Sequence, residues 1–244
     1  TASGKTLGEN LKDKRSLDLS VIASCKEPLR ENSGFLVISG NLFDSALMKT
    51  SVISDDFKKR FFSTPGKEGI FEAKAVVFEG PEDYHDRIND PELKIDDKSI
   101  LFIRGVGCVG YPGSAEVVNM LPPDKLVKEG INHLPTVGDG RQSGTSESPS
   151  ILNASPESVV GGGLAFLQTG DRVLLDLNKS KMSALVPEEE WETRKKNWVA
   201  PEIISHTPWE EIYRSHVGQL AEGGCLEMAT KYQKVRKTLS RDNH

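Results

Sequence analysis

The feature of this sequence that most constrains the fold is a series of short apolar runs rich in Val, Ile, Leu and Phe. They are "FLVIS" (35–39), "AVVF" (75–78), "SILFI" (99–103) and "RVLLDL" (172–177). Runs of four to six such residues have the length of β-strands and are too short for typical helices. The sequence therefore predicts at least four strands spread along most of the chain.

Helix signals lie between and after these runs. Pro81 followed by acidic residues opens one helix at "GPEDYHDRI", and Ser155 as a cap, with Pro156 behind it, predicts another at "SPESVVGGGLAFL". After residue 187 the chain reads "EEEWETRKKNW" and then "TPWEEIYRSHVGQL", in which Thr207 and Glu210 form a capping box. We expect a mixed α+β fold, with one β-rich domain flanked by helices and a helical C-terminal extension.

Composition excludes several classes of function. The net charge is -5 and the basic residues are scattered, so a nucleic-acid partner is not expected. No run reaches the ~18 apolar residues of a membrane span, and we expect a soluble protein. Three widely spaced cysteines, Cys25, Cys108 and Cys225, do not predict a disulfide framework. They favour a reducing compartment, the cytoplasm, with the mitochondrion as the alternative.

The first ten residues, "TASGKTLGEN", contain no initiating Met, so we expect a piece of a longer chain. Gly4, Lys5 and Thr6 match the last letters of a phosphate-binding loop, but neither a strand nor a glycine-rich lead-in precedes them. A helix starting near Leu7 is the simpler interpretation.

A glycine-rich segment, "RGVGCVGYPGSAEVV" (104–118), follows the third predicted strand. Gly105, Gly107 and Gly110 spell the dinucleotide-binding pattern G-x-G-x-x-G, yet Tyr-Pro-Gly follows where a helix should open. We expect the helix to begin instead with Ser114 as its cap. Glu116 would then lie in the first turn, either as an ordinary helix-stabilising glutamate or as a metal-binding carboxylate.

A second polar segment, "GDGRQSGTSESPS" (138–150), contains five hydroxyl side chains and no aliphatic residue. It could be a linker, a disordered tract or a functional loop, and the strand-like "HLPTV" before it favours a loop tied into the fold. Its small residues would let a ligand approach the backbone, and Ser143, Thr145 and Ser146 offer hydroxyls. The segment suits a small, oxygen-rich anion. The sequence does not indicate a Ser-His-Asp catalytic triad, and no histidine stands next to Cys108 to activate it as a nucleophile.

Two long motifs together resemble a known enzyme family. They are "IRGVGCVGYPGSAEVVNMLPPDKL" and "LPTVGDGRQSGTSESPSILNASPESVVGGGLAFLQTGDRVLLDL". Their order and spacing resemble the dihydroxyacid and sugar-acid dehydratases, the family that includes 6-phosphogluconate dehydratase, and the resemblance covers nearly the whole chain. The segments "GRQSGTSESPSILNASPE" and "PWEEIYRSHVGQLAEGGCLEMATKYQ" look like its sugar-acid branch, of the arabinonate or xylonate dehydratase type.

The resemblance implies a fold and a domain layout. The C-terminal domain of such enzymes is a swivelling β-barrel flanked by helices. In this chain it implies a helix or linker from a missing N-terminal domain at 1–20, the barrel at 21–187, and the helical extension at 188–244.

The resemblance also implies a reaction and site residues. A 2,3-dihydroxy acid loses a proton from C2 and hydroxide from C3, and the enol becomes a 2-keto acid. Ser143 matches the family's base and Glu116 a carboxylate that helps to hold Mg²⁺, 27 positions before it. Gly144 and Thr145 match substrate contacts. His244 matches a family tail that reaches the active site, with a frayed chain end as the alternative.

The cofactors implied are a [2Fe–2S] cluster and Mg²⁺. The family's cluster is held by cysteines of the N-terminal domain, which the three cysteines here do not match. We expect this chain alone to bind neither cofactor and to be inactive without its N-terminal domain. The full-length protein would be a homo-oligomer, a dimer or tetramer, acting on a sugar acid. The alternatives are a branched-chain 2,3-dihydroxyacid dehydratase domain and a non-catalytic binding or assembly module on the same fold.

Overall fold

A computed structural model of the chain describes residues 1–29, 34–142 and 147–232, and the chain divides into two units, residues 1–33 and 34–244. The first unit contains α1 (Leu7–Leu11). The Thr6 hydroxyl accepts a hydrogen bond from the Glu9 backbone N–H, and the Glu9 carboxylate accepts one from the Thr6 backbone N–H. This capping box confirms the helix expected after Thr6.

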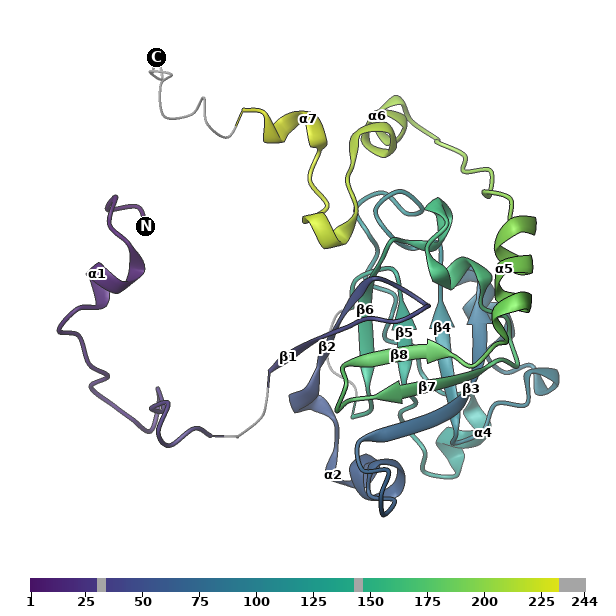
Figure 1. The fold of residues 1–244 in the computed structure, drawn as a ribbon, viewed down its shortest axis with the longest axis horizontal. Helices are drawn as coiled ribbons and strands as arrows, with labels where there is room; N and C mark the ends of the chain where they lie inside the picture. Colours follow the sequence, from purple (N-terminus) through teal and green to yellow (C-terminus); the bar gives the residue numbers. More distant parts are fainter. Residues whose placement is uncertain (30–33, 143–146, 233–244) are drawn as a thin grey trace. The chain divides into compact units, whose positions relative to one another are not determined.

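The second unit is built on one eight-stranded mixed sheet (Figure 1). Its strands are β1 (Phe35–Ile38), β2 (Ser45–Lys49), β3 (Ile70–Phe78), β4 (Ser99–Ile103), β5 (Thr136–Gly138), β6 (Ser150–Ser155), β7 (Arg172–Asp176) and β8 (Lys181–Ala184). Their order is β1-β2-β6-β5-β4-β3-β7-β8. The central strands β6, β5, β4 and β3 run parallel, and the outer strands pair antiparallel.

The two edge strands of this sheet meet, so the sheet nearly closes into a barrel. Ser39, just after β1, bridges to Lys181 at the start of β8. Its N–H donates to Ser180 O at 3.1 Å, and its carbonyl accepts from the Met182 N–H at 3.0 Å. Position 40, next to this contact, must be glycine, because a Cβ there would collide with the Met182 carbonyl. The expected barrel-like α+β fold is confirmed.

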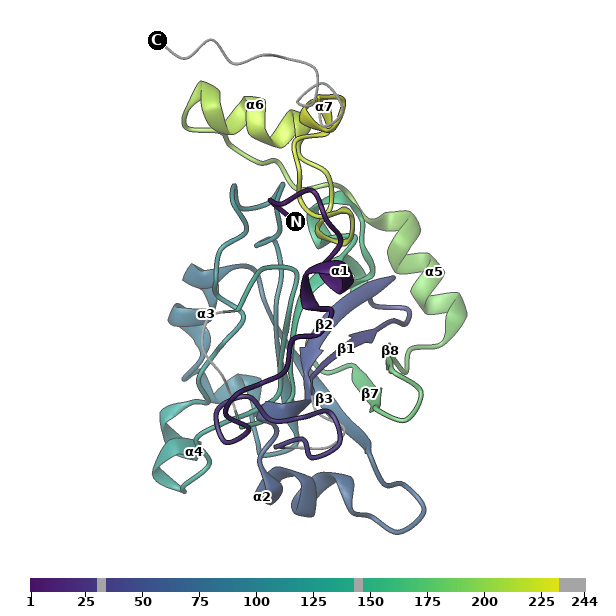
Figure 2. The same cartoon turned by 90° about the vertical axis from the view of Figure 1, so that its left-hand side faces the viewer.

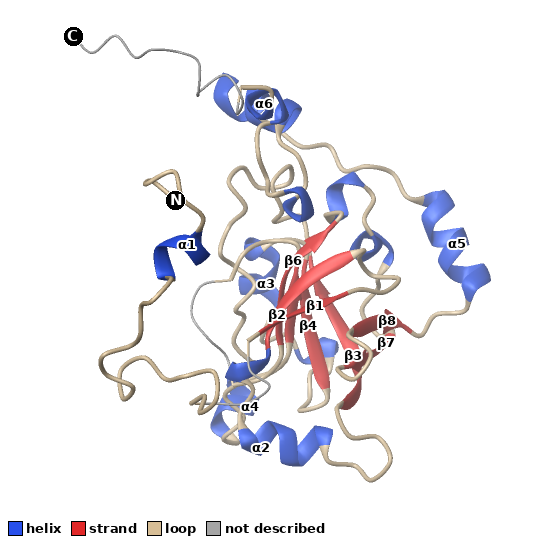
Figure 3. Cartoon of the chain, turned by 60° about the vertical axis from the view of Figure 1, so that its left-hand side comes forward, coloured by secondary structure: helices blue, strands red, loops and turns tan. Residues whose placement is uncertain are grey.

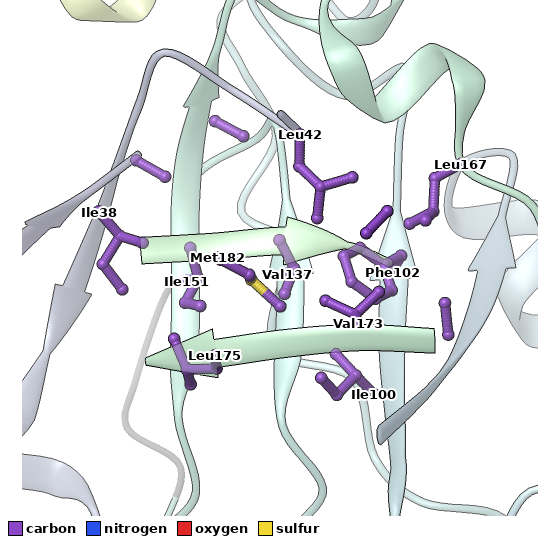
Figure 4. Packing of buried hydrophobic residues seen from close by; sticks show 14 of the residues in the cluster. Ile38, Leu42, Ile100, Phe102, Val137, Ile151, Leu167, Val173, Leu175 and Met182 are labelled. Carbon is purple, nitrogen blue, oxygen red and sulfur yellow. The ribbon is translucent and has the colours of Figure 1, made fainter. Parts of the chain in front are cut away.

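The barrel interior is filled by apolar side chains. They project from strands that cross one another at an angle (Figure 4). Side chains of β7 and β8 point toward those of β4, β5 and β6; the buried residues labelled there are Ile100, Phe102, Val137, Ile151, Val173, Leu175 and Met182. Leu101 and Ile103 point to the outer side of β4, in a second cluster with residues of the helical segments α3 (Pro81–Arg87) and α4 (Asp124–Lys128) nearby. β4 is therefore buried on both faces, which explains its unbroken apolar run.

The remaining helical elements are short except in the C-terminal extension. They are η1 (Thr50–Val52), α2 (Asp55–Phe57), η2 (Lys58–Phe62), η3 (Pro91–Leu93), η4 (Ser158–Val160), η5 (Gly163–Phe166), α5 (Glu188–Asn197), α6 (Pro208–His216), η6 (Leu220–Glu222) and α7 (Glu227–Thr230), of which Figure 3 labels α2, α5 and α6. The four predicted strands and the helices α3, α5 and α6 are confirmed. No helix in the described ranges is long and apolar enough to cross a bilayer.

The predicted helix at residues 155–167 is wrong. Ser155 is the last residue of β6, and only the two 3₁₀ turns η4 and η5 follow it. Gly161 adopts a φ of 87° and ends the first turn. A Cβ at Gly162 or Gly163 would collide with the backbone of Pro156 or Asn41. The three glycines thus permit close backbone packing, and this replaces a helix.

Helix α5 is anchored on the barrel by an aromatic cluster and an ion pair. Trp191 and Trp198 each pack edge-on against Phe166, and Arg194 pairs with Asp171 at 2.6 Å. Helix α6 lies further along the extension (Figure 2). Half of its predicted capping box is present, because the Thr207 hydroxyl accepts a hydrogen bond from the Glu210 N–H. The Glu210 carboxylate accepts from the N–H of His206 and not from that of Thr207.

Candidate functional site

The candidate site lies where three parallel strands end. The carboxyl ends of β4, β5 and β6 meet at one edge of the sheet, since Ile103 pairs with Gly138 and all three strands run in the same direction. Residues 104–113, here called the glycine loop, follow β4, and residues 139–149, the serine loop, follow β5. Ligands of α/β proteins often bind beyond the carboxyl ends of parallel strands.

The helix expected to begin at Ser114 is absent, and this prediction is wrong. Ser114 has a left-handed backbone with φ of 55°, and Glu116 forms an isolated parallel bridge with Arg141 of the serine loop. The Arg141 N–H donates to Ala115 O at 3.0 Å, and its carbonyl accepts from the Val118 N–H at 3.3 Å. The backbone groups that a helix would have paired internally are thus satisfied by a segment distant in the sequence.

The side chain of Arg141 reinforces the same pairing. Its Nε donates to Ser114 O at 2.8 Å, and its guanidinium lies 3.7 Å from a carboxylate oxygen of Glu116. Both side chains of this ion pair are about half exposed, 51% for Arg141 and 48% for Glu116. The long contact leaves the carboxylate oxygens of Glu116 accessible to a further cation at the start of the serine loop.

Four of the predicted site residues lie outside the described part of the chain. They are Ser143, Gly144, Thr145 and His244. The described chain reaches Gln142, one residue after Arg141. Glu116 is therefore brought beside the beginning of the serine loop, while the roles of Ser143, Gly144, Thr145 and His244 stay predictions.

A complete metal centre is not formed by the residues with described positions. They contain no group of three His, Cys, Asp or Glu side chains that could hold a metal ion. Glu116 fits the role of a single Mg²⁺ ligand, because it is an accessible carboxylate with one long contact. Among the cysteines, Cys108 is buried while Cys25 and Cys225 are exposed.

The glycine loop surrounds a buried carboxylate of the protein itself. Glu157, 2% exposed, accepts hydrogen bonds from the Val109 and Gly110 N–H groups at 2.9–3.1 Å. A Cβ at Gly107 would collide with the Glu157 carboxylate, so glycine is required there. Because the expected helix does not follow, the G-x-G-x-x-G pattern lacks its dinucleotide-binding context. Its glycines instead let the backbone approach Glu157.

A second buried carboxylate holds the other end of the glycine loop. Asp139, the first residue of the serine loop, accepts from the N–H groups of Gly105 and Val106 at 3.0–3.1 Å. It also accepts from the backbone and hydroxyl of Ser158 at 2.9 and 2.7 Å. Sequence reasoning missed both Asp139 and Glu157. The one signal for Asp139 is its place directly after a strand end, and Glu157 falls within the helix predicted at residues 155–167.

Burial shifts the ionisation of the groups around the glycine loop. It raises the pKa of Glu157, an effect to which the nearby Asp139 adds and which the Val109, Gly110 and Gln219 hydrogen bonds oppose. Burial and the charge of Glu157 also raise the pKa of the Cys108 thiol. A thiol held in its neutral form is a poor nucleophile, which speaks against a nucleophilic role for Cys108.

The raised pKa of Glu157 predicts a pH dependence of stability. When the pKa of a group is raised in the folded state, its protonated form adds to the free energy of unfolding. This addition is complete below the ordinary glutamate pKa of 4.5 and is lost as pH rises through the folded-state pKa. We expect Glu157→Gln to remove this decline, which amounts to at most about 1.4 kcal/mol per pH unit. Urea unfolding at a series of pH values checks this, with the exposed Glu202→Gln as control. Equal pH profiles for Glu157→Gln and the unmodified protein would contradict it.

Comparison with known proteins places these features in a family. Residues 20–225 match the family described as "Dihydroxy-acid/6-phosphogluconate dehydratase C-terminal". The chain is 57% identical over its whole length to D-xylonate dehydratase of Caulobacter vibrioides, covering 41% of that protein. It is 32% identical to L-arabinonate dehydratase of Rhizobium leguminosarum over 93% of this chain and 38% of that one.

The similarity extends to a relative that is named for a dihydroxy acid. Dihydroxy-acid dehydratase of Clostridium beijerinckii is 34% identical over 81% of this chain and 33% of its own length. The chain thus spans between a third and about two fifths of these relatives. On the match that covers most of its length, the chain belongs to the family of dihydroxy-acid/6-phosphogluconate dehydratase C-terminal domains.

Proposed function

We propose that this chain is the C-terminal part of a sugar-acid dehydratase and contributes one side of a composite active site. The product would be a 2-keto-3-deoxy sugar acid. The 57% identity to a protein named D-xylonate dehydratase favours a sugar acid over a branched-chain dihydroxy acid, for which the named relative is 34% identical.

The observation that supports this function best is the pairing of residues 114–118 with Arg141. It brings an accessible carboxylate, Glu116, next to the loop that continues into Ser143. The two motifs that the family resemblance links to chemistry are therefore neighbours at the carboxyl ends of parallel strands, where ligands of α/β proteins often bind.

In the proposed reaction, Ser143 removes the proton from C2 of the substrate as an alkoxide base. A serine hydroxyl ionises far above neutral pH, so the alkoxide needs positive charge close by. Arg141, two residues before Ser143, supplies one such charge on this chain, and Gly144 and Thr145 would contact the substrate from the same loop. Hydroxide leaves C3, and the resulting enol rearranges to the 2-keto acid.

Two cofactors are part of this proposal. Mg²⁺ would be held in part by Glu116, with its other ligands from the N-terminal domain, and a [2Fe–2S] cluster would be held wholly by that domain. When bound, Mg²⁺ supplies positive charge to stabilise oxyanions and the cluster supplies a Lewis acid for the leaving hydroxyl. Within this chain, Glu116 would be a ligand of the cation, and Arg141 contacts both Glu116 and the backbone of Ser114.

Substitution of Glu116 tests the proposed metal role. In the longer protein loaded with cluster, Glu116→Gln should raise the Mg²⁺ concentration for half-maximal turnover of D-xylonate by about 10- to 100-fold, because an anionic ligand becomes neutral. The matched control is Glu72→Gln. Glu72 pairs with Arg172 with exposures of 45% and 51%, similar to the Glu116–Arg141 pair, but on β3 and β7.

The control variant should keep the Mg²⁺ dependence of the unmodified enzyme. If Glu116→Gln did so as well, Glu116 would not be a Mg²⁺ ligand, and the ordinary structural interpretation of this residue would hold.

A further inference from the structure

The C-terminal extension contacts the glycine loop through groups that the proposed chemistry does not use. Arg214 of α6 donates from Nε to Val109 O at 3.0 Å. Gln219, just after α6, forms a reciprocal pair with Glu157: its Oε1 accepts from the Glu157 N–H at 2.8 Å, and its Nε2 donates to the Glu157 carboxylate at 3.0 Å. The extension thus reaches the buried carboxylate that holds the glycine loop.

In the described structure, the Glu157 carboxylate accepts one side-chain hydrogen bond, from Gln219. The carboxylate also accepts from the backbone N–H groups of Val109 and Gly110. A carboxylate this deeply buried is stable in its ionised form only when its oxygens are paired. Loss of Gln219 would leave the Glu157 N–H without its acceptor and remove one of three donors to the carboxylate. Gln219 therefore pairs with both the backbone and the side chain of the residue that binds the glycine loop.

A chain of hydrogen bonds connects this point to Glu116. Within the glycine loop the Tyr111 N–H donates to Gly107 O at 2.9 Å, and the Ser114 N–H donates to Tyr111 O at 2.8 Å. Ser114 O accepts from Arg141 Nε, and Arg141 pairs with Glu116. The turn that Glu157 holds thus determines where residues 114–116 leave the loop.

We propose that Gln219 is a positioning residue for the Glu116 carboxylate, acting through Glu157 and the glycine loop. The inference rests on the proposed role of Glu116 in Mg²⁺ binding. It assigns to the C-terminal extension a part in forming the active site, in addition to covering the barrel.

Asn41 offers a matched control for the loss of such an amide pair. Its side chain makes the same reciprocal pair with a backbone, donating to Ala184 O at 2.9 Å and accepting from the Ala184 N–H at 2.8 Å. This pair lies at the closure of the barrel, on β8, and is not among the contacts of the glycine loop. Asn41→Leu and Gln219→Leu therefore remove equivalent hydrogen bonds from different places.

The experiment compares these variants in the longer protein with two measurements. Hydrogen–deuterium exchange of peptides from residues 104–118 should become about tenfold faster in Gln219→Leu and stay unchanged in Asn41→Leu. The Mg²⁺ concentration for half-maximal turnover should rise about tenfold in Gln219→Leu only. Exchange reports on the loop without requiring activity.

Gln219→Glu adds a pH readout of the contact between residue 219 and Glu157. Its carboxyl would face Glu157, with Asp139, Cys108 and Tyr213 as the other titratable groups near that carboxylate. Two carboxyls at one site share a proton at low pH and repel when both ionise. Loop exchange in Gln219→Glu should therefore approach the unmodified rate at about pH 5.5 and exceed it about tenfold at about pH 8.5. This variant also serves if Gln219→Leu fails to fold.

The outcomes separate this inference from the proposed function. If Glu116→Gln leaves the Mg²⁺ dependence unchanged, the proposed function is wrong. If Glu116→Gln changes it while Gln219→Leu leaves either the loop exchange or the Mg²⁺ dependence at unmodified values, the positioning role is wrong. A pH-independent Gln219→Glu variant would also overturn it.

Discussion

Ser143→Ala in the longer, cofactor-loaded protein is expected to lower turnover of D-xylonate by roughly 10²- to 10⁴-fold, the usual contribution of a general base. The substitution removes the hydroxyl proposed to take the C2 proton. Turnover is measured from 2-keto acid formation, with the visible spectrum of the cluster showing that the cofactor is retained.

Ser148→Ala is the matched control within the same loop. The Ser148 hydroxyl donates to Leu134 O at 2.6 Å and is buried at the amino end of β5, away from the carboxyl edge. Its loss should reduce stability and keep turnover near the unmodified rate. Full activity of Ser143→Ala would remove Ser143 from the mechanism and favour a binding-module role for the serine loop.

Asp139→Ala is expected to lower the free energy of unfolding of this domain by about 3–5 kcal/mol. The side chain is completely buried and accepts four hydrogen bonds, from Gly105, Val106 and two groups of Ser158. Removing it leaves these donors without partners at the junction of the two loops. Denaturant unfolding followed by the fluorescence of the buried Trp191 measures the effect.

An exposed aspartate gives the scale for this prediction. Asp97 pairs with Arg60 at 3.0 Å with 39% of its side chain exposed, and Asp97→Ala should cost less than about 1 kcal/mol. If Asp139→Ala were equally mild, the hydrogen bonds to Asp139 would not be what holds the glycine loop to the serine loop.

The strands that could be predicted from sequence are those with continuous apolar runs. β4 has its run because both of its faces are buried, one in the barrel and one toward the outer cluster. β8, in contrast, is four residues long with the sequence KMSA and presents only Met182 and Ala184 to the interior. So short an alternation is not distinguishable from a loop, and its pairing with β7 is a tertiary effect.

The wrong helix predictions have a common cause in long-range backbone pairing. Ser114 and Ser155 each precede acidic residues as a helix cap does, but their surroundings are set by Arg141 and by the end of β6. A local pattern cannot show that a partner 23 to 26 positions away will take the backbone hydrogen bonds. Tertiary context therefore overrode the capping signals.

The candidate site was predictable only in part. The motifs around Glu116 and Ser143 were identified by family resemblance, and the structure adds the pairing of Glu116 with Arg141. The supporting carboxylates Asp139 and Glu157 could not be predicted, because acidic residues are usually exposed. Their burial depends on backbone N–H groups 33 to 48 residues away in the sequence.

The central claim, a sugar-acid dehydratase with one side of its active site on this chain, is tested most directly by the substrate range of the longer protein. After anaerobic reconstitution with iron, sulfide and Mg²⁺, 2-keto acid formation is measured with D-xylonate, L-arabinonate and a branched-chain 2,3-dihydroxy acid. We predict a 2-keto-3-deoxy product from a sugar acid, with a higher kcat/KM than for the branched-chain acid. Preference for the branched-chain acid would contradict the sugar-acid assignment, and no product from any of them with an intact cluster would contradict the dehydratase function itself.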